Sequence, residues 1–350
     1  MMLIGGRRER TGLAAAADLG GSAPGRDGPR GDLGLLEGLR RFIDGRRIEA
    51  ALPPDLRRRG VNLETRERLG GLTNQNYKIM VGGEALVLRL PGWGTGRFIR
   101  RSIERANQEA AARAGFTPHS VFFDGRTGVK ITRFLGESCA LDPRAAKSEV
   151  MAVAGLLARF HRSGLRFVND FDVFKLARTY ERVARGRFAR FYEGYAHIRT
   201  RVQAIERPLS LIAGEHVACH NDLVPENILA TPDGLTLIDW EYSGMNDPAW
   251  DLASFALESG FDEELEARFL AVYADGRVTE RLKIRVDAYK LLQDFLWSLW
   301  SILQETASRD PVRARSYRDY GMDRFLRARN RLAHVEARFG IDKRPEGKRR

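Results

Sequence analysis

The residues best suited to chemistry lie in one short polar segment, residues 220–227, and a little beyond it. Asp222 and Asn227 stand five residues apart in this segment, and Asp239 follows further along the chain. Phosphoryl transfer needs a carboxylate near the attacking hydroxyl group and oxygen ligands that hold Mg2+ on the phosphates. The pattern therefore predicts Asp222 as the catalytic base, with Asn227 and Asp239 as ligands of Mg2+.

A β-hairpin is expected to position these side chains. Segments 228–230 and 235–238 have the apolar residues of short strands, and the turn Thr-Pro-Asp-Gly at 231–234 lies between them. Asn227 leads into the first strand, and Asp239 ends the second. The candidate chemistry therefore gathers around one hairpin.

The chain before position 135 has the pattern of a small antiparallel sheet with one helix. Two short apolar runs flank Gly82-Gly83, which is a strong signal for a two-residue hairpin turn. A helix from about 98 to 114 should end at Gly115, and two more strands should follow around a glycine-containing turn. The expected strands are 77–81, 85–90, 121–123 and 129–134.

Beyond Asp142-Pro143 the apolar residues recur at a spacing close to 3.6, which indicates helices. Long helices are expected at 262–275 and 279–303, and the hairpin is the single β element expected among them. A short helix is expected at about 35–48. Residues 1–34 should form a disordered tail, because their Gly-, Ala- and Arg-rich composition cannot bury enough apolar surface.

The composition is that of a globular, intracellular chain. At 350 residues, 43% of them hydrophobic, it can bury a sizeable core. The net charge of +12 admits nucleic acid, an acidic membrane or an anionic small molecule as a partner, without choosing among them. Cys139 and Cys219 lack the spacing of a metal site or a disulfide framework, which indicates a reducing compartment. The apolar runs are too short for a transmembrane segment, and no secretory signal is present, so a cytoplasmic protein is expected.

The spacing of Asp222, Asn227 and Asp239 resembles the catalytic loop and the metal-binding aspartate of protein kinases. Trp240 and Glu241 follow Asp239, however, where a protein kinase would have Phe-Gly. The surrounding strings closely resemble the signature of the choline/ethanolamine kinases. These strings are Cys-His-Asn-Asp at 219–222, Glu-Asn-Ile-Leu at 226–229 and Leu-Ile-Asp-Trp-Glu-Tyr at 237–242.

This resemblance covers residues from about 63 to 329. It implies an α+β, protein-kinase-like bilobal fold, with a small antiparallel-sheet N-terminal lobe of five strands and a mainly helical C-terminal lobe. The expected division is a nucleotide-binding lobe at 35–138, a catalytic and substrate lobe at 139–340 and a basic tail at 341–350. ATP and Mg2+ are the implied cofactors, bound between the lobes.

The resemblance also marks residues that would bind ATP. The string Leu-Thr-Asn-Gln-Asn-Tyr at 72–77 is similar to the nucleotide loop of bacterial choline-kinase-like proteins, which implies that Thr73, Asn74 and Asn76 face phosphate. Arg89 stands at the strand position where protein kinases carry the phosphate-binding lysine. Its permanently charged fork suits phosphate oxygens.

An acidic residue on the following helix should orient Arg89, and Glu104 and Glu109 are the candidates. Glu104 is preferred, because its distance to Gly115 and Pro118 matches the family's pattern. The connection between the lobes, at 132–137, would lie against the adenine base. Its backbone candidates are Arg133 and Leu135.

The acceptor pocket is expected on a late helix. Trp297 and Trp300 are three residues apart and share one helical face, where two aromatic rings can hold an ammonium group. This helix and the later Tyr320 resemble the region in which choline kinases enclose the trimethylammonium head. Tyr242 would add an aromatic wall, and Glu241 a carboxylate that attracts the cation, although Glu241 could equally make a structural hydrogen bond.

The expected function is ATP- and Mg2+-dependent phosphorylation of a small amino alcohol, choline or ethanolamine. The string Asp-Pro-Ala-Trp-Asp at 247–251 looks more like bacterial choline-kinase and aminoglycoside-phosphotransferase relatives, and Asp251 should orient the catalytic loop rather than touch substrate. The alternatives are therefore an aminoglycoside, thiamine or another hydroxylated acceptor, and a pseudokinase that binds nucleotide without turnover. Nothing resembles a nucleic-acid-reading module, so no specific nucleic acid partner is expected.

Overall fold

The computed structural model describes residues 46–69, 74–92 and 99–341. The predicted tail at 1–34, most of the predicted helix at 35–48 and nearly all of the tail at 341–350 lie outside the described residues, as does Thr73. The described end of that helix, residues 46–51, is helical and stops just before Pro53 and Pro54.

A five-stranded antiparallel sheet forms the first lobe, with its strands in the order β1-β2-β3-β5-β4. Gly82 and Gly83 join β2 to β3 with φ values of 57° and 81°, which glycine adopts without strain. Both the strand number and the antiparallel pairing were predicted. The strands are β1 (Val61–Arg68), β2 (Gln75–Val81), β3 (Glu84–Leu90), β4 (Ser120–Phe123) and β5 (Lys130–Arg133).

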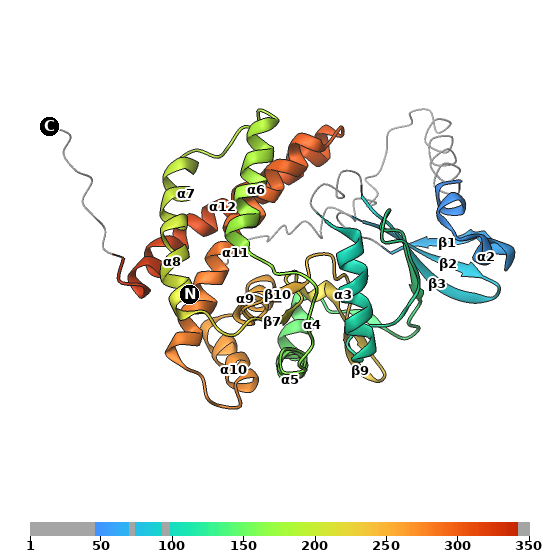
Figure 1. Ribbon diagram of the computed structural model, residues 1–350, viewed down its shortest axis with the longest axis horizontal. Helices are drawn as coiled ribbons and strands as arrows, with labels where there is room; N and C mark the ends of the chain where they lie inside the picture. Colours follow the sequence, from blue (N-terminus) through green and yellow to red (C-terminus); the bar gives the residue numbers. More distant parts are fainter. Residues whose placement is uncertain (1–45, 70–73, 93–98, 342–350) are drawn as a thin grey trace, which may run out of the picture.

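One face of this sheet is apolar and buried. Along β2, Tyr77, Ile79 and Val81 are buried and alternate with half-buried residues, because successive side chains of a strand point to opposite faces. The short helix α2 (Pro54–Arg58) adds Leu56 to the same core. Helix α3 (Arg101–Arg113), at the predicted position, lies on the side of the sheet that faces the second lobe (Figure 1).

The second lobe is mainly helical, as predicted, and has a core of its own. Its central helix, α11, is buried at every position from Ala288 to Leu303 and therefore has no water-facing side there. Helices α6, α9 and α12 pack around it. The helices are α4 (Pro143–Ser148), α5 (Val150–His161), α6 (Val173–Gly186), α7 (Tyr195–Ala204), α8 (Glu206–Ile212), α9 (Ala249–Glu258), α10 (Glu263–Tyr273), α11 (Glu280–Ala307) and α12 (Pro311–Arg338).

Two small sheets lie among these helices. β8 (Ile228–Thr231) and β9 (Gly234–Leu237) form the predicted hairpin, and β6 (Cys139–Ala140) pairs with β8. A second sheet pairs β7 (Val217–Cys219) with β10 (Gly244–Asn246). The prediction of a single β element in this lobe was therefore wrong, because strands of two or three residues are too short to show an alternating pattern.

Helices α11 and α12 approach each other closely at Gly321. A Cβ atom built on Gly321 would lie 2.5 Å from the Cβ atom of Ser301, and it would also meet the hydroxyl group of Tyr192. Glycine is thus what allows the two helices to pack at this distance. Of the helices in the described ranges, none is long and apolar enough to cross a membrane.

Gly321→Ala should lower the free energy of unfolding by about 1–3 kcal/mol, because the added methyl group forces α11 and α12 apart. Gly155→Ala in α5 is the matched control, since the nearest atom to its added Cβ would be 3.9 Å away. That variant should gain about 0.5–1 kcal/mol from the better helix propensity of alanine. Urea unfolding measures both changes, and wild-type stability of Gly321→Ala would contradict the close approach.

Candidate active site

One buried carboxylate holds the catalytic loop. Asp251, in α9, accepts the backbone N–H of His220 at 2.7 Å and that of Asn221 at 2.8 Å, and His161 Nε2 lies 3.1 Å from it. Burial opposes the ionisation of Asp251, but the hydrogen bond and charge interaction with His161 lower its pKa below the usual value. Asp251 orients the backbone of the loop, as predicted.

Asn221 gives the loop its turn. Its φ of 66° is in the left-handed region that most side chains avoid, and three neighbouring groups hold it there. Asn246 Nδ2 donates to its Oδ1 at 2.8 Å, Trp250 Nε1 donates to its carbonyl at 3.1 Å, and its own Nδ2 donates to the carbonyl of Tyr242 at 3.1 Å. The contacts of Asn246 and of the Tyr242 carbonyl were not predicted, because hydrogen bonds between distant segments leave no spacing pattern in a sequence.

The three residues predicted for phosphoryl transfer lie together at one end of the β8–β9 hairpin. Ile238 N donates to the carbonyl of Asn227 at 2.9 Å, which places Asp239 beside Asn227. Asn227 Nδ2 donates to the carbonyl of Asp222 at 2.9 Å, so its Oδ1 is the side-chain atom suited to a cation. The carboxylate of Asp239 is 27% exposed.

Asp222 is half-buried in a concentration of negative charge. Burial raises the pKa of Asp222 well above its usual value, and the charges of Asp239 and Glu241 raise it further. A cation among these groups would lower the pKa again, because it favours the ionised carboxylate. The carboxylate and amide oxygens present are the ligands that Mg2+ prefers, so the residues fit this metal.

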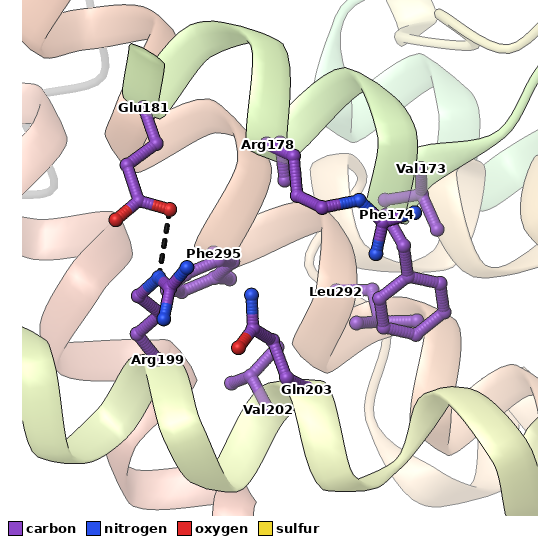
Figure 2. A pocket seen from close by; sticks show the side chains of 10 residues that line it. Val173, Phe174, Arg178, Glu181, Arg199, Val202, Gln203, Leu292 and Phe295 are labelled. Atoms are coloured by element: carbon purple, nitrogen blue, oxygen red, sulfur yellow. Dashed lines mark hydrogen bonds and ion pairs between the residues drawn. The ribbon is translucent and has the colours of Figure 1, made fainter.

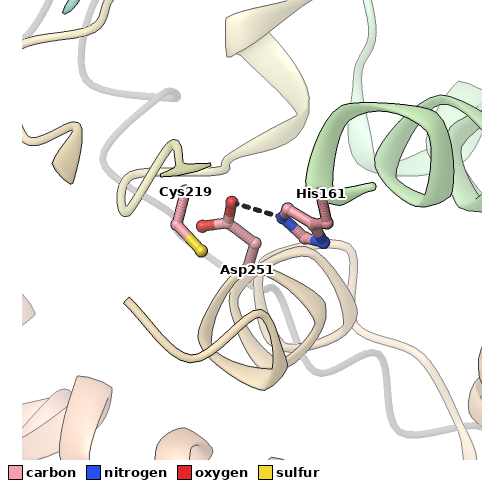
Figure 3. Close-up of side chains that lie close together, drawn as sticks. All are labelled: His161, Cys219 and Asp251. Atoms are coloured by element: carbon pink, nitrogen blue, oxygen red, sulfur yellow. Dashed lines mark hydrogen bonds and ion pairs between the residues drawn. The ribbon is translucent and has the colours of Figure 1, made fainter. Parts of the chain in front are cut away.

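Another group with the spacing of metal ligands lies behind the loop, where His161, Cys219 and Asp251 meet (Figure 3). The oxygens of Asp251 are already occupied by the two loop N–H groups and by His161. Burial raises the pKa of the Cys219 thiol well above its usual value, which keeps it protonated and a poor ligand. These side chains therefore support the catalytic loop.

Arg89, on β3, is paired with carboxylates from both lobes. Its Nη1 contacts Glu104 and lies 3.0 Å from Asp239 Oδ1, and its Nη2 donates to the carbonyl of Gly128 at 3.2 Å. Burial opposes the ionisation of Glu104, but the charges of Arg89 and Lys130 lower its pKa to about 2. Glu104 is thus an ionised partner of Arg89.

Glu109, the other candidate partner, takes no part in this pairing. Its carboxylate lies 2.7 Å from Arg105 on the exposed face of α3. The preference for Glu104 as the partner of Arg89 is confirmed.

A second cation, Lys130 of β5, lies opposite Arg89 in the sheet and was not predicted. Its ammonium group donates to Gln108 Oε1 at 2.8 Å and lies 3.9 Å from Glu104. Burial, together with the positive charge of Arg89, lowers the pKa of Lys130 to about 8.

Asn74 and Asn76 border this charged region. Asn74 is buried, and its Nδ2 donates to Glu241 Oε2 at 3.0 Å. Asn76 lies on β2 directly opposite Arg89.

In the connection between the lobes, the side chain of Arg133 points away from the other site residues. Arg133 lies 3.1 Å from Glu84 and is 75% exposed, so its side chain faces water. The hydroxyl of Ser138 donates to the carbonyl of Leu135 at 2.6 Å. Backbone contact of Arg133 and Leu135 with a base stays a prediction.

Four of the five residues predicted for the acceptor form one aromatic cluster. The ring centroids of Tyr242 and Trp297 are 5.3 Å apart, those of Trp297 and Trp300 are 6.4 Å apart, and those of Trp300 and Tyr320 are 6.3 Å apart. Each pair meets edge to face. Glu241 does not point into this cluster, because its Oε2 lies 3.1 Å from Arg101 of α3.

A buried arginine ends the aromatic cluster. The guanidinium of Arg324 lies 5.0 Å from the ring centroid of Tyr320 and 2.6 Å from Glu258, with Asp294 at 3.1 Å. Glu258 raises the pKa of Asp222 and Arg324 lowers it. Sequence reasoning missed Arg324, although its four-residue spacing from Tyr320 places both on one face of α12.

A cavity between α6, α7 and α11 lies apart from the predicted site residues (Figure 2). Its volume is about 10 Å³, room for about one water molecule. Glu181 and Arg199 pair at its side at 2.7 Å. The cavity is a packing feature between helices.

Comparison with known proteins relates the chain to a family of enzymes. Residues 64–286 match the phosphotransferase enzyme family. LicA of Haemophilus influenzae is 33% identical over 248 residues, which are 67% of this chain and 91% of LicA.

A crystal structure of LicA in complex with AMP has a TM-score of 0.71 at 32% identity and covers 84% of this chain and 98% of LicA. Choline kinase LicA from Streptococcus pneumoniae has a TM-score of 0.70 at 31% identity, over 84% of this chain and 99% of its own. The predicted protein-kinase-like bilobal fold is confirmed.

Lys130→Met should change the pH dependence of stability. The pKa of Lys130 is about 8 in the folded protein and about 10.4 in an unfolded chain. Between these values the unfolded state binds more protons, so this group makes the stability of the wild type rise with pH. The free energy of unfolding of the wild type, relative to that of the variant, should therefore rise with pH by up to about 1.4 kcal/mol per pH unit. Urea unfolding from about pH 8 to pH 10 tests this, and parallel pH profiles would contradict it.

Proposed function

The chain belongs to the phosphotransferase enzyme family and is a phosphotransferase of the choline/ethanolamine kinase type, and we propose that it transfers the γ-phosphoryl group of ATP to the hydroxyl of choline or ethanolamine, with Mg2+ as cofactor. The observation that carries this proposal is the meeting of Asp222, Asn227 and Asp239 at one hairpin, with Arg89 reaching Asp239 from the other lobe. The products are ADP and a phosphorylated amino alcohol.

Each of these residues has one role in the proposed reaction. Asn227 Oδ1 and the Asp239 carboxylate hold Mg2+, which neutralises phosphate charge when it is bound. Asp222 accepts the proton of the acceptor hydroxyl group as the phosphoryl group is transferred in line. Arg89 binds phosphate oxygens, and because its partners already fix its side chain it needs little reorganisation.

The remaining nucleotide contacts belong to the first lobe, which we assign to residues 35–138. Asn74 and Asn76 face the phosphates, and backbone groups of Arg133 and Leu135 face the adenine base. Residues 139–340 supply the catalytic loop and the acceptor pocket.

The aromatic cluster supports an acceptor that carries an ammonium group. A cation over an aromatic face gains about 0.5–2 kcal/mol, depending on how far it is removed from water. Within the cluster, the guanidinium group of Arg324 makes such a contact with the ring of Tyr320. Of the cluster, Tyr242 is nearest in sequence to Asp239 and is in contact with Trp297, so we assign the substrate ammonium group to this pair, with Trp300 behind it.

Turnover of ATP with a panel of acceptors tests the proposal. ADP release should be stimulated by choline or ethanolamine, require Mg2+ and fall at least about a hundredfold in Asp222→Asn, which lacks the base. Asp275→Asn is the matched control, because this carboxylate pairs with Arg162 at the surface and should leave turnover unchanged. Stimulation by thiamine or kanamycin alone would contradict the acceptor assignment. Nucleotide binding without turnover on any acceptor would favour a pseudokinase.

Trp297→Leu should raise the KM for choline about 2- to 30-fold, since it replaces the aromatic face by an apolar side chain. The KM for ATP should stay within about twofold of the wild type, because the nucleotide lies between the lobes. Trp297→Phe keeps a ring and should lie between the two. Steady-state kinetics with each substrate varied in turn measure these values. An equal rise in both KM values would show that Trp297 only supports the core.

A further inference from the structure

Glu241 follows the proposed metal ligand Asp239 by two residues, yet its carboxylate contacts the other lobe. Its Oε2 accepts a hydrogen bond from Asn74 Nδ2 at 3.0 Å and lies 3.1 Å from Arg101 Nη1. The next residue, Tyr242, packs against Trp297 instead. Glu241 therefore lies on the nucleotide side of the site and not among the aromatic rings.

Arg101 continues this contact into the first lobe. The same Nη1 atom lies 2.7 Å from Glu104 Oε2, Glu104 contacts Arg89, and Arg89 lies 3.0 Å from Asp239. Asp239 and Glu241 belong to one short segment, so these ion pairs form a closed circuit. The circuit crosses between the lobes twice, at Arg101–Glu241 and at Arg89–Asp239.

The Arg101–Glu241 contact is shielded from water. Only 3% of each side chain is exposed, so the charges are weakly screened and strongly favour the arrangement in which both are paired. Gly128 leaves room for Arg101, because a Cβ atom there would lie 2.6 Å from its Cδ and Nε atoms. By contrast, the pair between Arg105 and Glu109 on the same helix is about half exposed.

We infer that Arg101 and Glu241 are positioning residues that join the nucleotide-binding lobe to the metal-binding segment and so hold Asn74 and Arg89 at the phosphate site. The inference rests on the proposed function, because binding of phosphate by Asn74 and Arg89 is part of it. It assigns Glu241 to the nucleotide side, whereas the sequence left open attraction of the acceptor cation or a structural hydrogen bond. Nucleotide binding then depends on Arg101, a residue that makes its contribution through its contacts with Glu241 and Glu104.

The test combines a double-mutant cycle with an assay that needs no acceptor. Isothermal titration of the Mg2+ complex of AMPPNP measures nucleotide affinity in the wild type and in Arg101→Gln, Glu241→Gln and the double variant. Each single variant should bind about tenfold more weakly, and the loss in the double variant should be clearly smaller than the product of the two single losses, because either change already breaks the shared pair. Arg101→Lys keeps the charge and should recover part of the affinity. Arg105→Gln, from the exposed pair, should bind as the wild type does.

The KM for choline separates the two roles of Glu241. It should stay within about twofold of the wild type in Glu241→Gln, since a positioning residue of the nucleotide side does not touch the acceptor. A tenfold rise in this KM with unchanged AMPPNP affinity would overturn the inference and make Glu241 an acceptor ligand. Losses that multiply in the double variant would overturn it as well, because they would show independent effects. Normal AMPPNP binding by a wild type that uses neither choline nor ethanolamine would refute the proposed acceptor and leave this test valid. A wild type without nucleotide affinity would refute both proposals.

Discussion

Two backbone N–H groups bound to one buried carboxylate fix the geometry on which the site depends. Asp251 receives the N–H groups of His220 and Asn221, and leaving any of these polar groups unpaired inside the protein would be costly. The loop is therefore held in a single conformation, including the left-handed backbone of Asn221. Asp222 comes next in the chain, and Asn227 is bound to its carbonyl group. The positions of Asp222 and Asn227 thus follow from a buried residue that binds only the backbone of the loop and His161.

Charge then determines what can lie between the lobes. The first lobe contributes buried cations and one carboxylate, and the second contributes carboxylates near the β8–β9 hairpin. These groups are Arg89, Arg101, Lys130 and Glu104 on one side, and Asp222, Asp239 and Glu241 on the other. A polyphosphate suits the cations, and a divalent metal ion suits the carboxylates, so a nucleotide with its metal complements both at once. The aromatic cluster lies in the second lobe alone, so in the proposed reaction the acceptor and the nucleotide are recognised by different groups.

Local patterns in the sequence were sufficient for four strands of the first sheet, for α3 and for the hairpin that brings Asn227 beside Asp239, whereas the fifth strand was expected only from the family resemblance. Gly82-Gly83 and the turn at 231–234 each determine a tight connection through the chemistry of a few neighbouring residues. The pairing of β7 with β10 could not be predicted in this way, because it joins segments far apart in the chain. The ion pair of Arg101 with Glu241 was missed for the same reason. Glu241 was instead grouped with its neighbour Tyr242, although the two side chains contact different lobes.

A crystal structure of the protein with Mg2+, ADP and choline is the most direct test of this arrangement. The metal should be bound by Asn227 Oδ1 and the Asp239 carboxylate. The hydroxyl group of choline should lie within hydrogen-bonding distance of Asp222, with its ammonium group against Trp297 and Tyr242. Binding of the metal away from Asn227 and Asp239, or a choline hydroxyl group remote from Asp222, would contradict the proposed phosphoryl transfer.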